Sequence, residues 1–178
     1  MPQARPTSIG SSLETVVFVH GTWASAEDDR GEAWWQWGSQ WHRDLSRHLP
    51  ADVSLPAAHE VFHWSGENTE FARDRAAVDL LHRLAVLEAN GTGYHLVGHS
   101  HGGSIIWKAL RWSVRDVRLD EREYWHALSA WPKAQRDAWD ALPDQGVNED
   151  SLQGLRSWTT VGTPFMHRQF SAPDFPGQ

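Results

Sequence analysis

The sequence predicts an α/β fold in which a mostly parallel β-sheet is flanked by helices. Four short segments have the character of strands, at residues 15–20, 60–64, 94–97 and 155–161. Helical patterns lie between them, most clearly over Glu70–Ala89, where apolar residues recur on one face. Strands that alternate with helices favour a parallel sheet, because each helix can serve as the crossover between two parallel strands.

The first part of the chain is predicted to contain two strands and a helix. Thr15–His20 is a nearly unbroken run of β-branched and aromatic residues, which is typical of a strand buried on both faces. Ala33–Leu49 has a helical pattern that ends at Pro50, since proline does not continue a helix. Glu60–Trp64 is predicted to be a second short strand.

The next elements follow the Glu70–Ala89 helix. Gly91 suits the left-handed position that often caps a helix. Tyr94–Val97 is a compact apolar run that predicts a strand, and apolar residues over Ile105–Leu110 return at helical spacing. Leu155–Val161 is the last predicted strand.

We interpret residues 15–178 as a single domain that follows a flexible lead-in over residues 1–14. The lead-in lacks the apolar segment of a secretory signal, and no apolar run in the chain reaches membrane-spanning length. The chain has no cysteine, which excludes disulfides and thiol catalysis. These features predict a soluble, cytoplasmic protein.

The composition argues against several classes of function. A formal charge of -7 and the lack of a basic run give no electrostatic basis for binding nucleic acid. His59 and His63 would share a strand face, but no third metal ligand has a clear spacing to them. The glycines of residues 98–103 lack the lysine of a phosphate-binding loop. We therefore expect no metal, no cofactor and no nucleic-acid partner.

The segment Gly98-His99-Ser100-His101-Gly102 carries the strongest chemical signal. It matches G-x-S-x-G between a predicted strand and a predicted helix, which is the sharp turn that exposes a nucleophilic serine. Glycine is expected at Gly98 and Gly102, because these positions approach each other so closely that a Cβ would clash. Ser100 is therefore the candidate nucleophile.

Acyl transfer also needs donors for the developing oxyanion. The turn supplies one, the backbone N–H of His101 at the start of the helix. The second is expected from the loop after the first strand, where Gly21 lets the backbone come close to the site. There the backbone N–H of Thr22, or alternatively of Trp23, is the candidate donor.

Three motifs occur in the order seen in lipase-like α/β-hydrolases. They are HGTW at residues 20–23, GHSHGG at 98–103 and VGTPF at 161–165. The segment 62–68, with the helix after it, resembles a bacterial lipase and esterase branch of that superfamily. The resemblance covers roughly residues 14–114 and 155–166. Related lipases often carry a histidine after Gly-Thr-Pro, whereas this chain has Phe165.

The resemblance implies an α/β-hydrolase fold and an esterase or lipase-like activity. Ser100 would attack a carboxylic ester of a small molecule or lipid and form an acyl-serine intermediate. In this superfamily the acid and the histidine of the triad follow the serine, on loops after later strands. This chain reaches Gln178 soon after its last predicted strand. We therefore expect a C-terminally truncated chain whose sheet is incomplete at that edge.

Two alternatives remain. The chain could use an unusual base, such as His167 just after the last strand, or a residue of a partner. Alternatively, it could be a non-catalytic interaction domain with a degenerate hydrolase fold. His99 and His101 flank the nucleophile on a sharp turn, so their side chains are expected to point away from its hydroxyl.

Tryptophan is unusually frequent, with 12 residues in the chain. One group lies in the first predicted helix and another in the charged insert over residues 115–154, where lipase-like enzymes often carry a lid or cap. The members are Trp34, Trp35, Trp37 and Trp41 in the helix, and Trp125, Trp131 and Trp139 in the insert. They favour aromatic packing between helices and core. An apolar wall for an acyl chain, or a surface for a protein partner, is the other interpretation.

Overall fold

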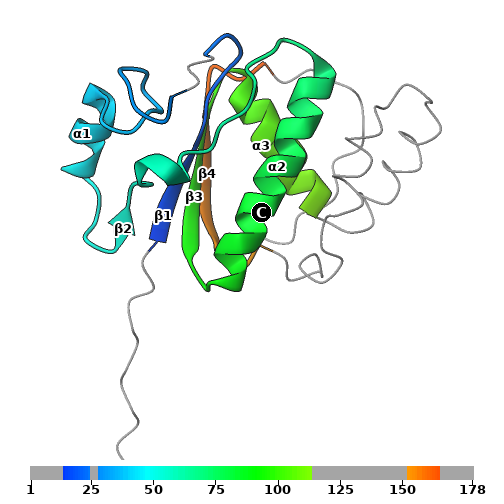
Figure 1. The fold of residues 1–178 in the computed structure, drawn as a ribbon. Helices are drawn as coiled ribbons and strands as arrows, with labels where there is room; N and C mark the ends of the chain where they lie inside the picture. Colours follow the sequence, from blue (N-terminus) through cyan, green and yellow to red (C-terminus); the bar gives the residue numbers. More distant parts are fainter. Residues whose placement is uncertain (1–13, 25–27, 114–151, 165–178) are drawn as a thin grey trace, which may run out of the picture.

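The computed structural model describes residues 14–24, 28–113 and 152–164 (Figure 1). A sheet of four strands in the order β2-β1-β3-β4 forms its centre, and all three strand pairings are parallel. The strands are β1 (Glu14–Val19), β2 (Val53–Ser54), β3 (Gly93–His99) and β4 (Leu155–Val161). The helices are α1 (Gln40–Ser46), α2 (Glu70–Ala89) and α3 (His101–Ser113), with a 3-10 turn at Ala58–Glu60. The predicted parallel sheet with flanking helices is confirmed.

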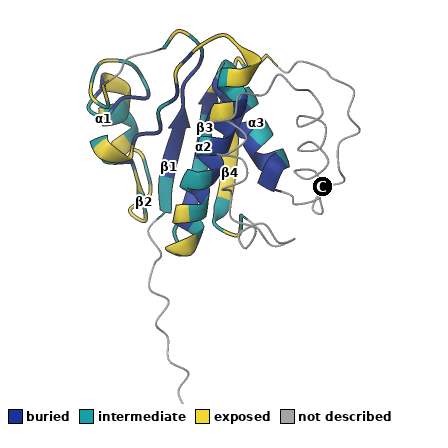
Figure 2. Ribbon diagram, turned by 45° about the vertical axis from the view of Figure 1, so that its right-hand side comes forward, coloured by how far each residue is buried: buried dark blue, intermediate teal, exposed yellow. Residues whose placement is uncertain are grey.

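The strand β1 is buried on both faces, as its composition predicted. Val17 and Val19 join one apolar cluster with side chains of α2 and α3. Val16 and Phe18 point the other way, into a second cluster that contains Trp35. Figure 2 shows β1 as a mostly dark blue arrow inside the fold. Burial on both faces places the carboxyl end of β1 in the interior, beside the end of β3.

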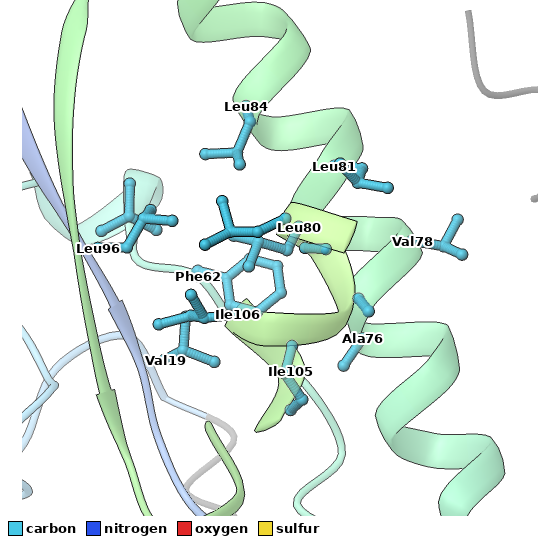
Figure 3. Close-up of a cluster of buried hydrophobic side chains, with 14 of the residues drawn as sticks. Val19, Phe62, Ala76, Val78, Leu80, Leu81, Leu84, Leu96, Ile105 and Ile106 are labelled. Carbon is cyan, nitrogen blue, oxygen red and sulfur yellow. The ribbon is translucent and has the colours of Figure 1, made fainter. Parts of the chain in front are cut away.

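The larger cluster fills the space between the sheet and the helices α2 and α3, which lie on the same face (Figure 3). Leu80 and Leu84 of α2 meet Ile105 and Ile106 of α3 above Leu96 of β3, all with no exposed surface. Each such side chain contributes roughly 1.5–3 kcal/mol by leaving water. This packing holds α3, and hence its first residue, against the sheet.

The helix α2 has the predicted limits. The side chain of Thr69 caps its start by accepting a hydrogen bond from the N–H of Ala72. Gly91 follows its end with a φ of 64°, the left-handed conformation that was predicted for this glycine. None of the described helices is long and apolar enough to cross a membrane.

The predicted helix over Ala33–Leu49 is mostly wrong, because only α1 forms within it. Gly38 adopts a φ of 82°, which is incompatible with a continuous helix. Ser39 then starts α1 as its N-cap, accepting from the N–H of His42. Ahead of it, the Gln36 side chain accepts from the N–H of Ala33 at 2.9 Å and supports a compact turn instead. Trp34, Trp35 and Trp37 join the cluster on β1 from this turn, whereas Trp41 packs on Phe18 from α1.

The predicted strand at Glu60–Trp64 is also wrong. The second strand is β2, which pairs only with the first two residues of β1. Val61, Phe62 and Trp64 are buried without forming a strand. Val61 joins the smaller cluster, and Phe62 and Trp64 join the larger. The indole N–H of Trp64 donates to the carbonyl of His20 at 3.0 Å. The apolar residues of the segment 60–64 indicated burial correctly, but a buried loop and a buried short strand have the same sequence pattern.

Candidate active site

Ser100 lies in the turn between β3 and α3, at the carboxyl end of the parallel sheet. The last residue of β1, Val19, pairs with Gly98 of β3, so the loop that follows β1 begins beside this turn. The turn and this loop therefore meet at one end of the sheet (Figure 1). Open α/β sheets bind their ligands at the carboxyl ends of the strands.

Ser100 has a left-handed backbone, with a φ of 52°. This conformation costs a residue other than glycine roughly 1–2 kcal/mol, so the surroundings must hold it in place. Its N–H donates to the carbonyl of Val161, the last residue of β4, at 2.8 Å. Its own carbonyl accepts from the N–H of Gly103 at 3.0 Å. The strand β4 and the start of α3 thus clamp the strained turn from both sides.

Three glycines make room for this turn, although not in the predicted way. A Cβ on Gly98 would lie 2.7 Å from the backbone nitrogen of Gly103, not against Gly102. A Cβ on Gly102 would lie 2.0 Å from the carbonyl oxygen of Val19 in β1. The loop glycine Gly21 passes so close to the nucleophile that its Cβ would lie 2.9 Å from the Cβ of Ser100. The close approach that was expected within the turn instead joins the turn, α3 and β1.

The strain at Ser100 gives a stability prediction. Ser100→Gly and Ser100→Ala both remove the hydroxyl, but only glycine relieves the left-handed backbone. We expect the free energy of unfolding of Ser100→Gly to exceed that of Ser100→Ala by about 1 kcal/mol. Urea denaturation followed by circular dichroism measures the difference. An alanine variant as stable as the glycine variant would show that the backbone there is not strained.

The candidate oxyanion donors lie on the two segments that meet at Ser100. His101 is the first residue of α3, so its N–H has no acceptor within the helix. Thr22 is next to Gly21 on the loop after β1, and its hydroxyl lies 3.2 Å from Nδ1 of His101. The backbone N–H of Trp23 donates to the carbonyl of Gly66 at 2.9 Å, which engages the alternative donor. This geometry favours Thr22 over Trp23.

The buried side chain of His20 contacts the loop after β1. His20 is 1% exposed, and its ring lies between Trp35 and Trp64, with centroids 4.5 and 5.5 Å away. Burial lowers its pKa, so the ring is neutral at pH 7. Its Nδ1 lies 2.9 Å from the carbonyl of Gly21, a contact in which the ring nitrogen donates. The sequence contains no signal for this role of His20, because its contacts with the two tryptophans are tertiary.

Charged residues gather where α2 begins, next to the turn. Burial raises the pKa of Glu70, but the ammonium of Lys108 and the guanidinium of Arg73 outweigh it and bring this pKa from 4.5 to about 2. Lys108 also lies 2.5 Å from Asp74, a carboxylate with 1% exposure. Burial lowers the pKa of His101, and the charge of Arg73 lowers it further. The charge of Glu70 opposes part of this shift. His101 is therefore neutral at pH 7.

Ser157, at the opposite end of the strands, contacts a histidine side chain. The Ser157 hydroxyl lies 2.8 Å from Nδ1 of His95, whose Nε2 lies 2.9 Å from Glu14. These residues come from three neighbouring strands and join them at their amino ends. Ser157 lies inside a paired strand, where the backbone groups serve the sheet, so it lacks the turn and helix start that Ser100 has. Sequence spacing carried no signal for this relay.

The triad partners of Ser100 are not found among the described residues. Within residues 14–24, 28–113 and 152–164, no histidine side chain forms a hydrogen bond with its hydroxyl. One histidine–carboxylate pair of this part of the chain, His63 with Asp29 at 2.5 Å, packs against Trp35 instead. The candidate base His167 and Phe165 lie outside the described residues, as does the predicted insert up to residue 151.

Comparison with protein-family models, with curated proteins and with solved structures finds no match for this chain. Among the described residues, no group of three or more histidine, aspartate or glutamate side chains is arranged to hold a metal ion. A functional assignment therefore depends on the chemistry of the turn and the loop beside it.

Proposed function

We propose that this chain has an α/β-hydrolase fold and is a serine esterase that cleaves a carboxylic ester of a small molecule or lipid. The observation that carries the proposal is the left-handed Ser100 between β3 and α3, with a φ of 52°. Strained backbone of this kind persists where the surroundings enforce it, and it concentrates at functional sites. The parallel sheet and the order of the motifs along the chain agree with this fold.

In the proposed reaction, Ser100 Oγ attacks the acyl carbon and a new C–O bond forms. The carbonyl π electrons move to the oxygen, which the backbone N–H groups of His101 and Thr22 stabilise. The tetrahedral intermediate then collapses, the alcohol leaves with the proton that the serine lost, and the acyl group stays on Ser100. Water releases the acid by the same two steps. The base that carries the proton is the part that the described residues do not supply.

Labelling with a fluorophosphonate probe tests the nucleophile in the full 178-residue chain. The wild type is expected to be labelled at Ser100, and Ser100→Ala is expected to lose labelling at least about 100-fold. Ser157→Ala is the matched control, because it removes a serine hydroxyl that contacts a histidine side chain and leaves the turn intact. It should be labelled like the wild type.

Equal labelling of the wild type and Ser100→Ala would contradict the proposal, and loss of labelling in Ser157→Ala alone would move the nucleophile to β4. A folded wild type that is not labelled would instead favour the non-catalytic interaction domain. Peptide mapping of the labelled protein identifies the modified serine directly.

A further inference from the structure

One side-chain contact joins the two residues whose backbone N–H groups are the candidate oxyanion donors. The hydroxyl of Thr22, on the loop after β1, lies 3.2 Å from Nδ1 of His101, the first residue of α3. The two residues are 79 positions apart in the chain, so only the tertiary fold brings them together. Both are half-buried, which shields the contact from water.

The chemistry of the contact follows from the charge of His101. Burial and the nearby guanidinium of Arg73 lower its pKa, against the opposing effect of Glu70, so the ring is neutral at pH 7. A neutral imidazole has one nitrogen with a free lone pair. We assign that lone pair to Nδ1, because the threonine hydroxyl then donates to it and Nε2 keeps the ring proton.

The loop that holds Thr22 needs such support. The next residue, Trp23, has a left-handed φ of 58° and a side chain that is 78% exposed, so its own packing does little to hold the loop. The N–H of Trp23 is tied to Gly66, and Gly21 lies against Ser100. Between these two points, the Thr22 side chain contacts the His101 ring, and this contact can fix the direction of the Thr22 N–H.

We propose that His101 is a positioning residue. Its imidazole holds the loop after β1, so that the Thr22 N–H points at the oxyanion formed on Ser100. This role rests on the proposed esterase function. It is separate from the backbone donor role of His101, because it uses the side chain alone. One residue thus contributes a donor directly and orients the other donor through its ring.

We expect the loss of this contact to slow acylation less than the loss of an oxyanion donor would. Deleting one oxyanion donor typically slows the chemical step about 100- to 1,000-fold. Loosening the loop leaves the N–H present but less well aimed, so we expect about a tenfold loss in the rate of acylation. Affinity for the substrate should change little, because the oxyanion forms only in the transition state.

The kinetic experiment measures the maximal rate and the half-saturating concentration of fluorophosphonate labelling in the full chain. His101→Ala and Thr22→Val should each lower the maximal rate about tenfold, with the half-saturating concentration within about twofold. His101→Asn and Thr22→Ser keep a polar group at the contact and should restore the rate to within about threefold. The double variant of His101→Ala and Thr22→Val should be no slower than either single variant, because both remove the same contact.

Additive losses in the double variant, or an asparagine variant as slow as the alanine variant, would overturn the proposal. Backbone relaxation of the Thr22 amide, measured by NMR, provides a readout that does not need activity. Its order parameter should be about 0.85 in the wild type and below about 0.6 in His101→Ala, with recovery in His101→Asn. An unchanged value in His101→Ala would overturn the positioning role, whereas a wild type without labelling at Ser100 would contradict the proposed esterase function instead.

Discussion

Gly102→Ala is expected to lower the free energy of unfolding by about 3 kcal/mol or more, the upper part of the range for overpacking a core. The added Cβ would lie 2.0 Å from the carbonyl oxygen of Val19 and 2.6 Å from that of His20. Both atoms belong to the backbone at the end of β1, which cannot retreat without breaking its pairing with β3. Chemical denaturation followed by circular dichroism measures the loss.

The sign of this effect contradicts simple helix propensity. Gly102 lies in α3, where alanine would ordinarily stabilise a helix interior by roughly 1 kcal/mol. Gly91→Ala is the matched control, because Gly91 has a φ of 64° but open space around its Cα. It should cost about 1 kcal/mol from backbone strain alone. A Gly102→Ala variant no less stable than Gly91→Ala would show that α3 does not press on β1 as described.

Lys108→Met is expected to lower the free energy of unfolding by about 3 kcal/mol at pH 7, because it leaves a buried carboxylate without its ammonium partner. Lys108 of α3 lies 2.5 Å from Asp74 of α2, whose side chain is 1% exposed. The pair therefore ties together the two helices that cover the sheet. Arg47→Met is the control, since it breaks an exposed pair with Asp44 and should change stability by less than about 0.5 kcal/mol.

A compensating variant distinguishes a lost ion pair from lost packing. Adding Asp74→Leu to Lys108→Met replaces the pair by two apolar side chains and should recover most of the stability. If the double variant is less stable than Lys108→Met alone, the carboxylate contributes through other contacts and the explanation is wrong.

Lys108 also determines part of the dependence of the free energy of unfolding on acidic pH. The pKa of Glu70 falls from 4.5 to about 2 on folding, mainly because the Lys108 and Arg73 charges outweigh burial. A depressed carboxyl pKa stabilises the fold above pH 4.5, and this contribution disappears as the pH falls towards 2. Lys108→Met should therefore show a weaker loss of stability over that interval than the wild type. Glu70 is about half exposed, so added salt should also reduce the difference.

Regular elements with strong patterns could be predicted from the sequence alone. The helix α2 was found with both limits, because its apolar face repeats over several turns and Gly91 marks its end. The helix predicted over Ala33–Leu49 does not form before α1, because Gly38 turns the chain there. Element limits depend on local capping, whereas aromatic packing on β1 depends on contacts from elsewhere in the chain.

The sequence by itself determined the α/β order, the two-sided burial of β1 and the candidate nucleophile Ser100, because these depend on local periodicity and on a turn spelled out by neighbouring residues. Only the tertiary structure decided what surrounds that turn. Val161 of β4 clamps its backbone, Gly102 presses on β1, and the His101 ring reaches Thr22. Each of these contacts joins segments far apart in the chain, and residue spacing contains no record of which distant backbone or ring the fold will bring within hydrogen-bond distance.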